Sequence, residues 1–153
     1  MIIFEEKISL EKLPEFCEKL AQEISSGDCV CLSGEIGSGK TTFLYHFLKT
    51  LGMEEDVDFS SPTFTIHHIY KIKEKIFHHI DLYRLGNFSE LETLDLIPFF
   101  QSSQDVVFVE WGDKFKELQP LYNKKINFFY LPGENNSRLI SYDVSRSHLK
   151  KGL

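Results

Sequence analysis

The hydrophobic positions along this chain change their spacing several times, and each change predicts a new element. A short apolar run at residues 2–4 predicts a strand. Apolar residues then recur at the intervals of an amphipathic helix, with Ser9 suited to cap the helix and Gly27 suited to end it. The apolar positions of this predicted packing helix are Leu10, Leu13, Phe16, Cys17, Leu20 and Ile24.

A strand, a glycine-rich loop and a second helix are predicted next. Residues 29–32 form an apolar run typical of a buried strand, and bulky residues follow at helical spacing over 42–48, before Gly52. Between them, residues 34–41 read Gly-Glu-Ile-Gly-Ser-Gly-Lys-Thr, which matches the GxxxxGKT phosphate-binding loop. The motif therefore has the strand and helix context that its chemistry requires.

The rest of the chain predicts further strands and one short helix. Ser89 is suited to cap that helix, with Glu92 as its capping-box partner, and a turn at residues 132–136 joins the last two strands. After an acidic loop, the predicted elements are a hairpin of strands 63–72 and 75–82 around Lys73-Glu74, the helix at 89–96, and strands at 106–109, 126–130 and 139–142.

Together these elements predict one α/β domain, with a mixed central β-sheet flanked by helices, as in a small P-loop NTPase. A length of 153 residues with 42% hydrophobic and 14% aromatic content fits a single folded domain. We assign the domain to residues 1–145. We expect residues 146–153, which include the basic pair Lys150-Lys151, to be a disordered tail.

Charge limits the partners that the chain is expected to have. The formal net charge of −6 argues against an independent nucleic-acid binder, which usually carries a basic surface. The first residues are acidic where a signal peptide needs a basic start, and no apolar stretch approaches the length of a membrane span. We therefore expect a cytoplasmic protein that has no membrane partner and meets nucleic acid only through another protein.

We expect the cysteines and histidines to be part of the packed structure and not to bind a metal. Cys29 and Cys31 are two apart on a predicted strand, so they share one face and fit the role of small buried hydrophobes, as does Cys17. The pairs at residues 67–68 and 78–79 place one histidine on each face of a strand. Neither set has the spacing typical of a zinc site.

The phosphate loop assigns a role to each of its main residues. Gly34, Gly37 and Gly39 allow the backbone to turn tightly, so that successive N–H groups point at a polyphosphate near the positive end of the helix dipole. Lys40 would reach the outer phosphates, and Thr41 would offer its hydroxyl to magnesium. We therefore predict that the chain binds a nucleotide together with Mg²⁺.

A magnesium ion in such a site also needs a carboxylate at the end of a neighbouring strand. Glu110 follows the cleanest apolar run of the chain, so we assign it to magnesium. Asp81 ends a run that histidines interrupt, and we expect it to position the attacking water or to stand behind the magnesium ligands. The alternative for Asp81 is a turn acid paired with Arg84. Trp111 beside Glu110 either stacks on a bound group or belongs to the core.

Missing motifs argue against several nucleotide-dependent classes. A GTPase should carry Asn-Lys-x-Asp, but residues 123–126 read Asn-Lys-Lys-Ile and lack the aspartate. A transporter ATPase needs Leu-Ser-Gly-Gly, whereas residues 32–34 run directly into the phosphate loop. A small-molecule kinase should have an arginine-rich lid, and few arginines are present.

Five segments taken together resemble the TsaE family. They occur in the order and approximate spacing of that family, and the resemblance covers roughly residues 5–140. The segments are residues 34–42, Ser-Pro-Thr-Phe-Thr at 61–65, His-Ile-Asp-Leu-Tyr-Arg-Leu at 79–85, Glu-Leu-Glu at 90–92 and Glu-Trp at 110–111. This chain departs from the family at Asp95, where glycine is common, and at Pro98, which interrupts the following helix.

The resemblance implies an ATPase of the machinery that makes threonylcarbamoyladenosine at position 37 of tRNA, acting with the TsaD and TsaB proteins. It implies that Thr41 and Glu110 hold Mg²⁺. It also implies that the segment at residues 61–65 is a switch-like loop facing the phosphates. The residues implied to contact ATP are Gly34, Gly37, Ser38, Gly39, Lys40, Thr41, Thr42, Thr63, Trp111 and Arg138.

Two other functions stay open at this point. One is a small-molecule kinase, which would transfer phosphate to an acceptor other than water. The other is a nucleotide-sensing adaptor, in which ATP binds but its hydrolysis is incidental.

Overall fold

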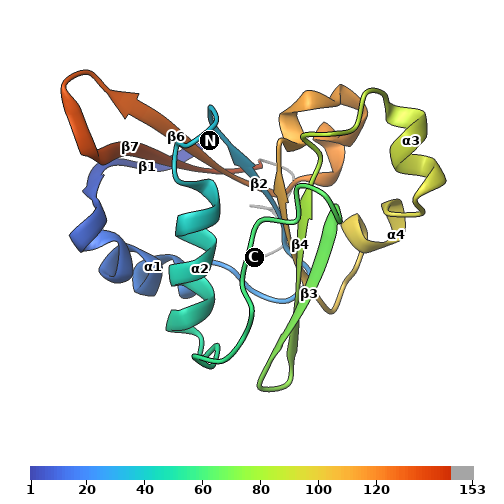
Figure 1. Ribbon diagram of the computed structural model, residues 1–153, viewed down its shortest axis with the longest axis horizontal. Coiled ribbons are helices and arrows are strands. Elements are labelled where there is room, and N and C mark those ends of the chain that lie inside the picture. Colours follow the sequence, from blue (N-terminus) through green and yellow to red (C-terminus); the bar gives the residue numbers. More distant parts are fainter. Residues whose placement is uncertain (146–153) are drawn as a thin grey trace.

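The structure is a computed structural model that describes residues 1–145, and it is built on one seven-stranded mixed sheet (Figure 1). The predicted disordered tail, residues 146–153, lies outside the described residues. The strand order is β1-β7-β6-β2-β5-β4-β3. The strands are β1 (Ile2–Ser9), β2 (Cys29–Ser33), β3 (His67–Ile72), β4 (Lys75–Asp81), β5 (Val106–Glu110), β6 (Lys124–Leu131) and β7 (Glu134–Val144).

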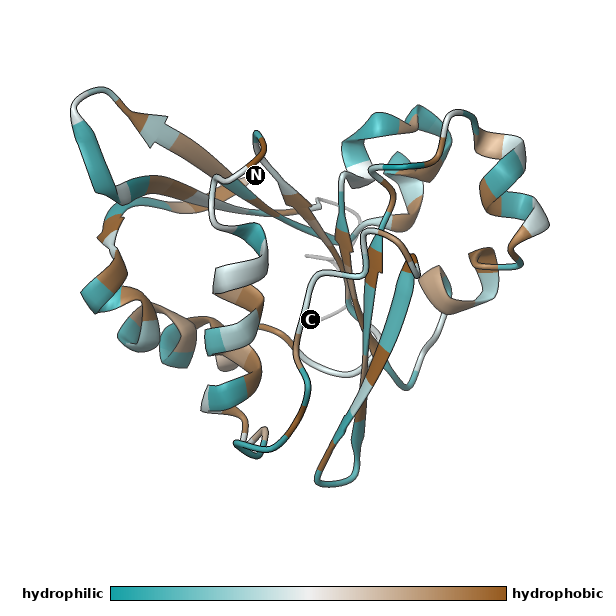
Figure 2. Cartoon of the chain, in the orientation of Figure 1, coloured by the Kyte–Doolittle hydropathy of each residue, from teal (hydrophilic) through white to brown (hydrophobic). Residues whose placement is uncertain are grey.

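Helical segments cover both faces of this sheet, so the predicted α/β architecture is confirmed. Figure 2 shows hydrophilic and hydrophobic stretches alternating along α1, as a helix with one buried side requires. The α-helices are α1 (Leu13–Ala21), α2 (Lys40–Thr50), α3 (Phe88–Thr93) and α4 (Ile97–Phe100), and the 3₁₀ turns are η1 (Leu10–Lys12), η2 (Gly112–Lys114) and η3 (Lys116–Leu121).

Two hydrophobic clusters lie on opposite faces of the sheet because side chains alternate along each strand. On β2, Val30 and Leu32 join the cluster under α1 and α2, whereas Cys29 and Cys31 join the cluster under α3, α4 and η3. The expected shared face and burial of the two cysteines are confirmed.

The central strands place two acids at one edge of the sheet. Strand β2 runs parallel to β5, and β5 runs parallel to β4. Asp81 and Glu110 end their strands as partners in register, and Glu110 also pairs with Leu32, next to the phosphate loop. Glu110 therefore lies on the strand beside the loop strand, and Asp81 lies one strand further away.

The first helix differs from its predicted bounds. Strand β1 runs to Ser9 rather than stopping near residue 4, because residues 4–9 pair continuously with β7 after an irregularity between Ile2 and Phe4. The Ser9 side chain accepts a hydrogen bond from the Lys12 backbone N–H at 3.3 Å, so Ser9 caps the short turn η1 instead of the helix itself. Helix α1 then begins at Leu13 and ends at Ala21, short of Gly27.

The segment after Pro62 also differs from the prediction. Strand β3 begins at His67 and not at residue 63, because the Ile66 N–H bonds to the Pro62 oxygen at 2.6 Å and Ile66 has a positive φ of 71°. This turn is too tight for a strand. Residues 63–66 therefore form a turn that leads from the site into the sheet.

The helical region at 88–100 is split into two short helices. Helix α3 begins at Phe88 with Asn87 as its cap, so the predicted cap Ser89 and its partner Glu92 are wrong. Asp95 has a positive φ of 55°, a backbone conformation that favours glycine, and Pro98 lies in the first turn of α4. The two departures from the family pattern therefore lie at the break between the helices and at the start of the second one. Among residues 1–145, no helix is long and apolar enough to cross a membrane.

Candidate functional site

The phosphate loop joins the end of β2 to the start of α2, as the motif predicts. Gly37 and Gly39 have positive φ angles of 74° and 107°, which only glycine adopts at low cost. Gly34 is needed for a different reason, because a Cβ there would lie 2.5 Å from the Ser38 Oγ and 2.8 Å from the Phe128 carbonyl oxygen. The loop therefore packs closely against β6 and opens toward the N-terminus of α2.

Lys40 is buried at the first position of α2 and folds back over the loop. Its Nζ donates to the carbonyl oxygens of Gly34 at 2.5 Å and Glu35 at 3.0 Å, and lies 4.4 Å from the centre of the Trp111 ring. Burial lowers the pKa of Lys40, while the nearby carboxylates, of which Glu110 is the strongest, oppose that shift. The ammonium group is therefore held by neutral oxygens and an aromatic ring.

Glu110 is buried and receives hydrogen bonds from three directions. The Thr41 Oγ1 donates to its two oxygens at 3.0 and 3.1 Å, the Ser61 Oγ to Oε2 at 3.3 Å, and the His79 Nε2 to Oε2 at 2.5 Å. Burial alone would raise the pKa of Glu110, but the hydrogen bond from His79 and the other contacts outweigh it and hold the pKa below the usual value.

Asp81 is buried beside Glu110 and binds the loop that precedes β3. Its Oδ2 accepts hydrogen bonds from Ser61 at 2.9 Å and Thr63 at 3.0 Å, and its Oδ1 accepts one from the Tyr83 N–H at 2.9 Å. The Arg84 guanidinium instead lies over the Phe64 ring, 4.7 Å from its centre. The predicted pairing of Asp81 with Arg84 is therefore wrong, although the bond from the Tyr83 N–H is that of a turn acid.

An open cleft of about 500 Å³ brings most of the candidate residues together. Trp111, half-buried with a positive φ of 61°, lines the cleft and also packs against the hydrophobic cluster behind it. The loop that carries Ser61 and Thr63 lines the cleft too. The cleft is lined by residues 36–42 and by Ser61, Thr63, Asp81, Tyr83, Glu110 and Trp111.

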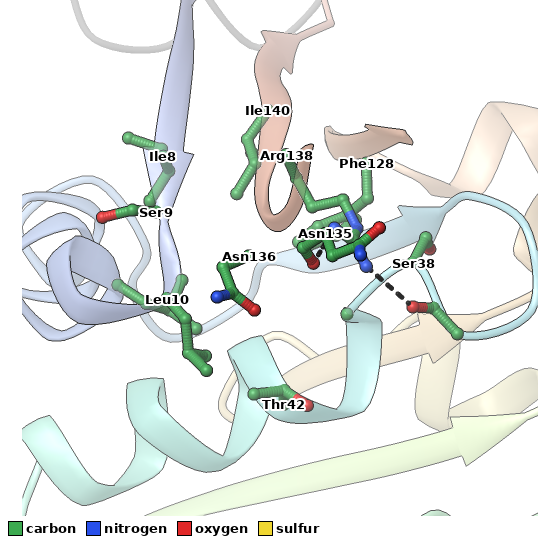
Figure 3. Close-up of a pocket in the computed structure, with 13 residues that line it drawn as sticks. Ile8, Ser9, Leu10, Ser38, Thr42, Phe128, Asn135, Asn136, Arg138 and Ile140 are labelled. Carbon is green, nitrogen blue, oxygen red and sulfur yellow. Dashed lines mark hydrogen bonds between the residues drawn. The ribbon is translucent and has the colours of Figure 1, made fainter. Parts of the chain in front are cut away.

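A second pocket of about 250 Å³ lies on the other side of the phosphate loop (Figure 3). Leu10 lines it from η1, just after β1, and Asn136 and Arg138 line it from the β6–β7 hairpin. The Arg138 Nη2 donates to the Gly37 oxygen at 3.4 Å, and the Tyr130 hydroxyl donates to the Ile36 oxygen at 2.6 Å. Arg138 is thus separated from the two acids but contacts the loop.

Sequence reasoning did not include His79, Ser61 and Tyr83 among the site residues. His78 and His79 are neighbours on β4, so their side chains point to opposite faces of the sheet. The sequence does not indicate which of the two faces holds the site. His78 lies on the other face and bonds to Asp105 at 2.7 Å and His67 at 2.8 Å. A resemblance to the family's switch-like loop was the one signal that pointed to Ser61.

The oxygens at the cleft suit a magnesium ion because Mg²⁺ prefers carboxylate and hydroxyl ligands and keeps several waters. Thr41 and Glu110 supply one hydroxyl and one carboxylate close together. Residues 1–145 contain no group of three or more His, Cys, Asp or Glu side chains arranged to hold a metal. A magnesium ion here would therefore take its remaining ligands from water and phosphate.

Comparison with known proteins identifies the family of this chain. A family model described as "Threonylcarbamoyl adenosine biosynthesis protein TsaE" matches residues 8–140. A Haemophilus influenzae protein named tRNA threonylcarbamoyladenosine biosynthesis protein TsaE is 33% identical over 112 residues, which are 73% of this chain and 69% of the relative. The protein of that name from Streptomyces coelicolor is 40% identical over 108 residues, covering 68% of this chain and 70% of the relative.

A solved structure extends the match to the fold. The crystal structure of Bacillus subtilis YdiB superposes with a TM-score of 0.71 at 25% identity, covering 99% of this chain and 92% of that one. The family match spans the phosphate loop, both strand-end acids and the β6–β7 hairpin. The chain therefore belongs to the TsaE family of tRNA threonylcarbamoyladenosine biosynthesis proteins.

Proposed function

We propose that this protein is the magnesium-dependent, ATP-binding and ATP-hydrolysing component of the tRNA threonylcarbamoyladenosine machinery. One observation carries the proposal: a complete phosphate loop with Lys40 and Thr41 faces Asp81 and Glu110, two buried acids at the ends of adjacent parallel strands. This is the set of groups that phosphoryl transfer to water needs.

The two pockets suggest how ATP would lie across the loop. The cleft that holds Lys40 and the acids would take the outer phosphates, and the pocket beside Leu10 and Arg138 would take the nucleoside. Residues 37–39 and Thr42 line both spaces, so the phosphate chain would cross them. The volume and partly apolar walls of the second pocket fit a base better than another phosphate.

Each side chain of the cleft then has a task in hydrolysis. Lys40 would exchange the carbonyl oxygens of Gly34 and Glu35 for phosphate oxygens, which carry more charge. Thr41 and Glu110 would hold the magnesium ion, which neutralises charge on the phosphates. Asp81 would orient the attacking water once Ser61 and Thr63 give up its oxygen.

We further propose that TsaD and TsaB are the partners, that tRNA is reached only through them, and that the protein works in the cytoplasm. The acidic chain fits indirect contact with tRNA. Ile36 and Tyr83, which line the cleft, are 66% and 45% exposed, and Phe64, next to Thr63 in the chain, is 80% exposed. Exposed apolar side chains of this kind suit contact with another protein.

The test is a depletion experiment in cells that carry one copy of the gene. We expect tRNA to lose threonylcarbamoyladenosine on depletion, measured by mass spectrometry of digested tRNA. The wild-type protein should restore the modification and the Lys40→Ala variant should not. Normal modification after complete depletion would refute the proposal.

Two measurements separate the proposal from its alternatives. Phosphate release with water as the acceptor opposes a small-molecule kinase. A variant that binds ATP without hydrolysing it should fail to restore the modification, whereas a nucleotide-sensing adaptor would still work with that variant.

A further inference from the structure

His79 is a fully buried side chain with a single polar contact. It lies on β4, two residues before Asp81, and its Nε2 donates to the Glu110 Oε2 at 2.5 Å. The other ring nitrogen, Nδ1, is buried and has no hydrogen-bond partner among residues 1–145. Because a carboxylate only accepts, the ring contributes one N–H and directs it at Glu110.

An aromatic stack from the preceding loop fixes the plane of this ring. Phe59 lies nearly parallel to the imidazole of His79, with centres 5.8 Å apart and planes 14° apart. Phe59 is itself packed against Tyr70 at 5.4 Å and Tyr45 at 5.5 Å. The imidazole is therefore held between the sheet and this loop, so its N–H keeps one direction.

The other two donors to Glu110 have competing tasks. The Thr41 hydroxyl would turn to the magnesium ion, and Ser61 shares its hydroxyl between Glu110 and Asp81. Ser61 also lies on a loop rather than on the sheet. His79 is the donor that comes from a central strand and has no second acceptor.

We propose that His79 is a positioning residue for Glu110, which holds one carboxylate oxygen so that the other is presented to magnesium. This inference rests on the proposed function, because it assumes that Glu110 binds Mg²⁺ with the nucleotide. Groups behind metal ligands commonly contribute 10- to 100-fold in metal affinity. Loss of the His79 hydrogen bond should therefore weaken the response to magnesium and leave the magnesium-independent contacts of ATP in place.

The experiment measures ATP affinity by calorimetric titration, first with EDTA and then at increasing Mg²⁺. His79→Leu keeps an apolar side chain against Phe59 and removes the donor. We expect the Mg²⁺ concentration that gives half of the affinity gain to rise about 10- to 100-fold. The affinity in EDTA should stay within about twofold of the wild-type value, because the lost hydrogen bond is not to the nucleotide.

Two comparisons isolate the hydrogen bond. His79→Gln places an amide N–H near the position of Nε2 and should restore the wild-type midpoint, whereas the shorter His79→Asn should not. His78→Leu is the matched control, because His78 is equally buried on the same strand but bonds to Asp105 on the other face. It should leave the midpoint unchanged.

The outcomes separate this inference from the proposed function. If the wild-type protein binds ATP with no gain from magnesium, both fail. If the wild type shows the gain and His79→Leu shows the same midpoint, the positioning role is overturned while the proposed function stands. If His79→Leu does not fold, the comparison of His79→Gln with His79→Asn decides. Equal Mg²⁺ midpoints in those two variants would overturn the positioning role of His79.

Discussion

The Lys40 ammonium group donates to the carbonyl oxygens of Gly34 and Glu35 in the phosphate loop. ATP would replace these carbonyls as the acceptor. Lys40→Ala should therefore weaken ATP binding at least about tenfold, because a hydrogen bond to a charged group contributes about 1.5–3 kcal/mol. Calorimetric titration measures this loss. The folded structure should persist, as judged by circular dichroism.

Lys49→Ala is the matched control on the same helix. Lys49 pairs with the exposed Glu55 at 2.5 Å, away from the cleft, and such surface pairs contribute little. Its ATP affinity should equal that of the wild type. Unchanged affinity and turnover in Lys40→Ala would refute the assignment of the loop.

The two acids should give different phenotypes because they have different neighbours. Glu110 contacts Thr41, the predicted magnesium hydroxyl, whereas Asp81 contacts Ser61 and Thr63. Glu110→Ala should abolish the part of ATP affinity that depends on magnesium. Asp81→Asn should keep ATP binding and lose hydrolysis. Affinities with and without magnesium, together with phosphate release, measure both, and the reverse pattern would exchange the roles.

The three thiols should be unreactive in the folded protein. Burial raises the pKa of Cys17 and of Cys31 to about 12 and raises that of Cys29 as well. At pH 8 the thiolate is the reacting species, so labelling by a disulfide reagent should be slower than that of free cysteine by on the order of a thousandfold. Labelling in urea should reveal all three thiols, and fast labelling without urea would contradict their burial.

The sequence predicted those site residues that have a local signal. Lys40 and Thr41 follow from the loop motif, and Asp81 and Glu110 from their places at strand ends. His79 and Ser61 could not be assigned in the same way, because their roles depend on which strand lies next to which. The hydrogen bond between His79 and Glu110 joins residues that are 31 positions apart. Such a contact produces no pattern in the spacing of residues along the sequence.

At the level of elements, hydrophobic spacing predicted the existence of the helices and strands better than their ends. Strand β1 is longer than its apolar run because β7 provides backbone partners as far as Ser9. The turn at residues 63–66 replaces a predicted strand because the Ile66 N–H bonds back to the Pro62 oxygen, and the Thr63 side chain there bonds to Asp81 rather than joining the sheet. Asn87 caps α3 because its side-chain oxygen accepts a hydrogen bond from the Glu90 N–H. The sequence predicted Ser89, two residues later, as the cap.

Gly34→Ala tests how closely the phosphate loop packs on β6. The new Cβ would meet the Ser38 Oγ at 2.5 Å and the Phe128 backbone oxygen at 2.8 Å, and backbone cannot move aside as a side chain can. We expect a loss of about 1–3 kcal/mol in the free energy of unfolding, together with weaker ATP binding. Urea titration and calorimetry measure the two effects.

Gly86→Ala serves as the control for this substitution. A Cβ at Gly86 would approach the mobile end of the Glu90 side chain at 3.3 Å. Its free energy of unfolding should change by less than about 0.5 kcal/mol. Equal effects of the two substitutions would contradict the packing argument.

At the level of the whole molecule, the cleft in which ATP would react is open to bulk water. The proposed ATPase should therefore be slow alone and faster with TsaD and TsaB, because a partner can order the loop that carries Ser61 and Thr63 over the phosphates. Phosphate release measured with and without both partners tests this prediction. The same rate in both conditions would contradict partner activation, and stimulation of Lys40→Ala would show a contaminating ATPase.

The pocket beside the phosphate loop has one wall from each end of the described chain. Leu10 lies near the beginning and Asn136 near the end, and Ile8 pairs with Arg138 across β1 and β7. During synthesis the phosphate loop would leave the ribosome roughly 5–20 s before the hairpin that closes this pocket. ATP would therefore stabilise finished molecules in preference to truncated ones, and the ligand itself would help the cell to retain only chains that are able to work.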